Sequence, residues 1–69
     1  MNRYLIKKIR QMKGMSQLQF SQALGVSRGL IAQVEAGYIS PSPELKNKIR
    51  AFAGDDFIAQ LSNLIGGVS

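Results

Sequence analysis

Hydrophobic residues recur along the chain at spacings of three and four, and glycine or proline interrupts them about every eleven residues. This pattern is typical of short helices, and no segment shows the strict alternation of a strand. We therefore predict an all-α protein with five helical segments. They extend to Lys13, from Ser16 to Gly25, from Ser27 to Gly37, from Ser42 to Gly54 and from Asp55 to Gly66.

Residues suited to helix starts support these boundaries. Ser16 can accept a hydrogen bond from the free amides of the second helix, and Gln19 completes a capping box. Ser27, Ser42 and Asp55 are the expected caps of the later helices. The apolar stripes consist of Leu5, Ile6, Ile9 and Met12; Leu18, Phe20 and Leu24; Ile31 and Val34; Leu45, Ile49 and Phe52; and Phe57, Ile58, Leu61, Leu64 and Ile65.

The length of 69 residues fits a single domain, residues 1–69, and the hydrophobic fraction of 45% is that of a globular chain. A core of this size rarely supplies more than about 3–5 kcal/mol, so we expect self-association into a homodimer. No apolar run approaches the roughly 20 residues of a membrane span, and the amino terminus is not organised as a signal peptide. We expect a cytoplasmic protein.

The residue types exclude most catalytic chemistry. The chain contains no Cys and no His, which removes thiolate nucleophiles, imidazole-based triads and the commonest metal ligands. Of the four carboxylates, Asp55 and Asp56 are adjacent, and Glu35 and Glu44 form no acid–base motif. We predict that the protein is not an enzyme and needs no metal, no cofactor and no small-molecule substrate.

Positive charge is concentrated in the first segment. The net charge is +5, and the five cations of residues 1–13 account for it, because the other four cations and the four acids cancel. Such a patch can neutralise phosphates and make binding fall with salt. We assign Lys13 to the backbone of a nucleic acid, whereas Lys7 and Lys8 are equally well explained as solvated. A membrane-surface role is disfavoured, since Leu5, Ile6 and Ile9 are needed for the core.

Residues 16–37 place two capped helices around a turn pinned by Gly25, which is a helix-turn-helix pattern. From about Ile6 to Phe52 the chain resembles the Cro and repressor family of phage and bacterial regulators. The residues that carry this resemblance are Gln17, Phe20, Ser21, Leu24, Gly25, Val26, Ser27, Ile31, Val34, Glu35 and Gly37. It implies a five-helix bundle whose third helix enters the major groove of operator DNA, in a bacterial cell or a phage-infected host.

The third helix has a side that is unusual for plain solvent. Opposite Ile31 and Val34, it presents Arg28, Gly29, Ala32, Gln33 and Ala36, with no acid. Small residues allow a close approach to base edges, and Arg and Gln are the side chains that read guanine and adenine. We assign base reading to Arg28, Gly29, Ala32 and Gln33. Because the family often has a polar side chain at the position of Gly29, recognition depends more on Arg28 and Gln33.

Other positions are expected to hold the DNA backbone or the fold. Helix starts attract anions, which favours Ser16 and Ser27, and the loop can offer Tyr38, Ser40 and Ser42. The resemblance implies that Gln17 touches the DNA backbone. It also implies that Arg10 pairs with Glu35 and braces the first helix against the third.

The last segment, residues 55–66, has an apolar surface wider than a small bundle needs, and no charge follows Asp56. Family members often dimerise through this helix, so we expect Ile58, Leu61, Leu64 and Ile65 at a dimer interface. The leading hypothesis is a regulator that binds a palindromic operator as a homodimer, most plausibly a repressor. The alternative is a protein-interaction module, such as an antitoxin or antirepressor, with secondary DNA binding.

Overall fold

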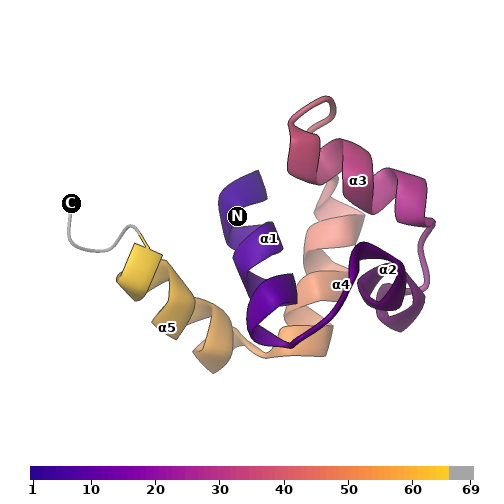
Figure 1. The fold of residues 1–69 in the computed structure, drawn as a ribbon. Coiled ribbons are helices and arrows are strands. Elements are labelled where there is room, and N and C mark those ends of the chain that lie inside the picture. Colours follow the sequence, from indigo (N-terminus) through magenta and orange to yellow (C-terminus); the bar gives the residue numbers. More distant parts are fainter. Residues whose placement is uncertain (66–69) are drawn as a thin grey trace.

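The computed structural model describes the backbone of residues 1–65 and the side-chain surroundings of residues 1–64. This part of the chain is all-helical, as the hydrophobic spacing predicts. The helices are α1 (Arg3–Met12), α2 (Gln17–Leu24), α3 (Arg28–Ala36), α4 (Pro43–Ala53) and α5 (Asp55–Ile65) (Figure 1). None of them is long and apolar enough to cross a membrane. Gly66, the expected end of the last helix, lies outside the described residues.

Three helices begin at the predicted serine caps. The Oγ atoms of Ser16, Ser27 and Ser42 each accept a hydrogen bond of 3.1 Å from the amide three residues ahead. At Ser16 the box is complete, because Gln19 Oε1 accepts the Ser16 N–H at 2.9 Å. These bonds satisfy amides that have no partner within the helix. The predicted starts of α2, α3 and α4 are therefore confirmed.

The joint between α4 and α5 differs from the prediction. Asp55 is the first residue of α5 rather than its cap. Gly54 donates its N–H to the Arg50 carbonyl at 2.8 Å and accepts the Ile58 N–H at 3.1 Å, so one residue ends α4 and begins α5. Gly54 adopts a φ of 88°, which favours glycine. The expected cap at Asp55 was wrong because Gly54, the single residue between the two helices, already occupies the position before the first turn of α5.

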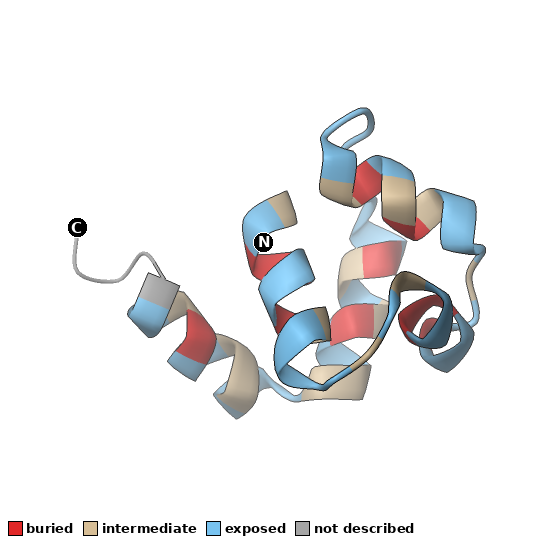
Figure 2. Cartoon of the chain, in the orientation of Figure 1, coloured by how far each residue is buried: buried red, intermediate tan, exposed pale blue. Residues whose placement is uncertain are grey.

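The core lies where the five helices meet. Helix α5 packs on α1 and α4, α3 packs on α1 and α2, and α2 packs on α4. Each helix contributes buried residues to this contact region (Figure 2). Phe20 and Phe52 pack edge to face, with ring centroids 5.9 Å apart. The buried apolar residues are Leu5, Ile6, Ile9, Phe20, Leu24, Ile31, Val34, Leu45, Ile49 and Leu61.

Three described residues of the predicted apolar stripes, Leu18, Met12 and Leu64, are exposed rather than buried in the core. Leu18 is 51% exposed, because it precedes the buried Phe20 by two residues and so points about 200° away from it. Met12, the last residue of α1, is 57% exposed. The buried stripe of α1 ends at Ile9.

Two glycines in open surroundings should respond oppositely to an added methyl group. Gly25 ends α2 with a φ of +72°, whereas Gly29 lies within α3, and a Cβ at either would meet no atom within 4 Å. Gly25→Ala should lower the free energy of unfolding by about 1 kcal/mol because of its left-handed backbone. Gly29→Ala should raise it by about 0.5 kcal/mol through helix propensity. Urea unfolding followed by circular dichroism measures both, and equal signs would contradict this account.

Candidate nucleic-acid interface

The turn between α2 and α3 is fixed by backbone hydrogen bonds. The Gly25 N–H donates to the Gln22 carbonyl at 3.3 Å, and the Val26 N–H donates to the Ser21 carbonyl at 2.9 Å. These bonds close the carboxyl end of α2 in the manner of a Schellman motif. Val26 is half-buried against the core. Residues 16–37 thus form two capped helices joined by a tight turn.

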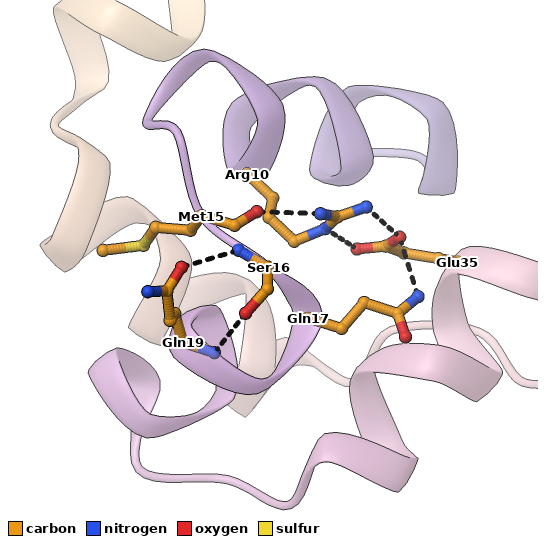
Figure 3. A network of polar contacts seen from close by, with 6 residues as sticks. All are labelled: Arg10, Met15, Ser16, Gln17, Gln19 and Glu35. Atoms are coloured by element: carbon orange, nitrogen blue, oxygen red, sulfur yellow. Dashed lines mark hydrogen bonds and ion pairs between the residues drawn. The ribbon is translucent and has the colours of Figure 1, made fainter.

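A polar cluster centred on Glu35 ties α3 to both preceding helices (Figure 3). Arg10 Nε donates to Glu35 Oε2 at 2.7 Å and Arg10 Nη2 donates to Glu35 Oε1 at 3.0 Å, which is a bidentate ion pair. Gln17 Nε2 donates to Glu35 Oε1 at 3.2 Å. Arg10 Nη1 also donates to the Met15 carbonyl at 2.8 Å. The cluster therefore joins α1, the linker to α2, the start of α2 and the inner side of α3.

The opposite side of α3 faces solvent. Arg28, Gly29, Gln33 and Ala36 are exposed and Ala32 is half-buried, whereas Ile31 and Val34 are fully buried. On a helix of 3.6 residues per turn, the positions of Gly29, Ala32 and Ala36 form a central row, and Arg28 and Gln33 flank it. The predicted reading strip is thus a single open surface that no other described part of the chain covers.

Residues 6–49 match the family model described as helix-turn-helix, which covers more than half of the chain and includes the turn, the Glu35 cluster and the open side of α3. This chain belongs to the Cro/C1-type helix-turn-helix family. The family consists of DNA-binding regulators, and this protein is a DNA-binding regulator in that general sense. No curated protein and no solved structure matches the chain.

The residues expected to contact phosphates differ in exposure and in the hydrogen bonds that they already make. Ser16, Ser27, Tyr38, Ser40 and Ser42 are all exposed. The three serines at helix starts already accept cap hydrogen bonds, and each hydroxyl still has its proton to donate to a phosphate. The Gln17 amide nitrogen is directed to Glu35 inside the protein.

Lys13 contacts aromatic rings rather than extending freely. Its Nζ lies 4.3 Å from the ring centroid of Phe57 and 6.0 Å from that of Phe52. This is cation–π geometry, and it connects the end of α1 to the joint between α4 and α5. Lys13 therefore has a structural role besides the expected contact with a phosphate. The sequence did not indicate this role, because the two phenylalanines are about forty residues further along the chain.

The predicted dimer residues are not equivalent. Leu61 is only 4% exposed and belongs to the core of the monomer, so it has no surface to offer a partner. Ile58 is half-buried, and Leu64 is 76% exposed. The side chain of Ile65 lies outside the described residues. Leu64 is therefore the best exposed candidate on α5 within the described part.

Sequence reasoning missed two residues at the start of α1. Asn2 Oδ1 accepts the Leu5 N–H at 2.9 Å and caps the helix, a role that its residue type and position could have indicated. Arg3 donates to the carbonyl of Ala36, the last residue of α3. No local signal identifies this second contact, because it joins residues 33 positions apart.

Breaking the Glu35 cluster should destabilise the fold far more than breaking a surface ion pair. The Arg10 and Glu35 side chains are only 13% and 4% exposed, so Glu35→Ala leaves a buried guanidinium and a buried amide without their partner. We expect a loss of about 3 kcal/mol in the free energy of unfolding, measured by urea titration.

The matched control is Glu44→Ala, which removes the exposed Glu44–Lys48 pair at 3.8 Å. This change should cost less than about 0.5 kcal/mol. A similar cost for the two variants would show that the Glu35 cluster does not hold the helices together.

Proposed function

We propose that this protein is a sequence-specific regulator that binds a palindromic operator in double-stranded DNA as a homodimer and represses transcription by occlusion. The observation that carries the proposal is the open, acid-free side of α3, which belongs to a helix braced by α1 and α2. Because α1 and α2 hold α3 in place, the side chains of α3 would meet a DNA groove in a fixed orientation. Family membership supports DNA binding in general, and the remaining features are our inference.

The arrangement of the strip suits the major groove. Its central row of Gly29, Ala32 and Ala36 has little side-chain bulk, so the helix axis can come close to the base edges. Arg28 can donate two hydrogen bonds to guanine O6 and N7, and Gln33 can pair with adenine N6 and N7. The methyl group of Ala32 suits contact with a thymine methyl. Arg28 and Gln33 therefore specify bases, and the small residues permit their approach.

Backbone contacts would come from both ends of this surface. The exposed Ser16 and Ser27 and the half-buried Gln17 belong to helix starts, where the helix dipole and the free backbone amides favour phosphate. Tyr38, Ser40 and Ser42 follow α3 and can donate from hydroxyl groups. Four of the five cations of residues 1–13 add a salt-dependent attraction, since the fifth, Arg10, is paired with Glu35.

The homodimer is proposed from the exposed apolar residues of α5. Leu64 is a large hydrophobic residue with 76% of its surface exposed, and Ile58 on the same helix is only half-buried. Pairing two chains about a two-fold axis through this helix would cover both residues. Two reading helices could then enter successive major grooves about 34–36 Å apart, which is the half-site spacing of dimeric helix-turn-helix proteins.

Arg28→Ala should weaken binding to the selected operator by about tenfold to a hundredfold and relax the preference at one base pair of each half-site. The measurement is fluorescence anisotropy on a duplex selected from a random pool. Arg50→Ala is the matched control, since Arg50 is also exposed and lies on α4, where its side chain donates a hydrogen bond to Asn47. Unchanged affinity and unchanged base preference in Arg28→Ala would reject the reading strip.

Leu64→Asp should raise the dimer dissociation constant by about tenfold or more, because a buried leucine contributes about 1.5 kcal/mol or more. Asn63→Asp, which adds the same charge at the neighbouring exposed position, should change it little. Sedimentation equilibrium measures both. A wild-type monomer that binds DNA only with an added protein would instead support an antitoxin-like interaction module.

A further inference from the structure

Arg3 connects the first turn of α1 to the last turn of α3. Its Nη1 donates to the Ala36 carbonyl at 2.8 Å, and its Nη2 donates to the Tyr4 hydroxyl at 2.8 Å. The guanidinium also lies 4.8 Å from the centroid of the Tyr4 ring. The Ala36 carbonyl is at the negative end of the α3 dipole, where a cation is stabilising. The planar fork of Arg3 is thus held by contacts on both sides.

Gly37 has a reason to be glycine that the other left-handed glycines of the described chain lack. Its φ is +85°, and a Cβ there would occupy the position of Arg3 Nη1. At Gly14, Gly25 and Gly54 a Cβ would meet nothing within 4 Å. The missing side chain at Gly37 therefore leaves the space in which Arg3 reaches the end of α3.

We infer that Arg3 is a positioning residue for the reading helix. Helix α1 holds α3 at two places, through Arg10 on Glu35 and through Arg3 on Ala36. The two arginines are seven residues apart, which is about two helical turns or roughly 10 Å along α1. On α3 the two arginines meet consecutive residues, Glu35 through its side chain and Ala36 through its carbonyl, so the Arg3 contact adds a direct restraint on the last turn of α3. Arg3 thereby fixes the carboxyl end of α3. Gln33 lies in this last turn, and the loop with Tyr38 follows it.

This inference rests on the proposed function for its effect on DNA, and a direct role for Arg3 is the competing explanation. Arg3 and Lys46 line a groove of about 490 Å³ beside Ile39, Ser40 and Pro41, with no carboxylate among its lining residues. An arginine there could bind a DNA phosphate directly. Losing a phosphate contact lowers the salt dependence of binding by about one unit and affects all sequences equally, whereas losing a positioning contact lowers the preference for the operator.

The first test compares DNA binding by Arg3→Gln, Arg3→Lys and Lys7→Gln, where Lys7 is an exposed cation on the same helix. Arg3→Gln should weaken operator binding about fivefold to tenfold and lower the ratio of operator to random-duplex affinity. Lys7→Gln should leave that ratio unchanged. Arg3→Lys keeps the positive charge but should still lower the ratio, because an ammonium lacks the planar fork. The inference would be overturned in favour of a phosphate contact if Arg3→Gln reduced the slope of log affinity against log salt concentration by about one and left the ratio of operator to random-duplex affinity unchanged.

The second test needs no DNA and therefore separates this inference from the proposed function. The Gly37 and Tyr38 amides donate within the last turn of α3, to the Val34 and Gln33 carbonyls at 3.1 and 3.0 Å. In Arg3→Gln, hydrogen exchange of these amides should accelerate about threefold or more, and in Lys7→Gln it should not. Unchanged exchange in Arg3→Gln overturns the inference. If no duplex can be selected with the wild-type protein, the proposed function fails while exchange still decides whether Arg3 holds α3.

Discussion

The arrangement of α3 depends on the hydrogen bonds of the Glu35 carboxylate. This carboxylate is removed from solvent on the inner side of α3, where an ionised group is costly unless hydrogen bonds satisfy it. Two N–H groups of Arg10 and one of Gln17 do so. Because these donors come from α1 and α2, satisfying one charge fixes three helices relative to one another. A purely apolar contact would bury the same surface with less directional restraint.

The helix caps and the turn at Gly25 fix where α3 begins and therefore which of its residues are exposed. The serine hydroxyls at the starts of α2, α3 and α4 are used by backbone amides, and Gly25 lets the chain reverse within three residues. The hydrogen bonds that these oxygens accept fix the local geometry of the helix starts. The long donors on the outer side of α3, Arg28 and Gln33, remain exposed. The sequence therefore separates residues that position the helix from residues that are free to meet a ligand.

The sequence predicts the parts of this protein that are determined over a few residues. Caps such as Ser27, and the helix-turn-helix itself, follow from spacing because both partners of each bond lie within one turn of helix. The Arg10–Glu35 pair was reached only through resemblance to a family. The Arg3–Ala36 contact and the position of Lys13 over Phe57 could not be found, since they depend on which helices become neighbours. Local pattern also misplaced Leu18, whose apolar character does not decide which side it faces.

The Glu35 cluster has an electrostatic consequence as well as a mechanical one. Helix α3 contains a single acidic residue, and that residue is neutralised by Arg10 on the inner side. The outer side is left with the charge of Arg28 alone. If Glu35 were free to point outward, its charge would lie within a turn of the exposed side of α3 and would repel phosphates. The same hydrogen bonds that orient α3 therefore also remove the one charge that would oppose its approach to a polyanion.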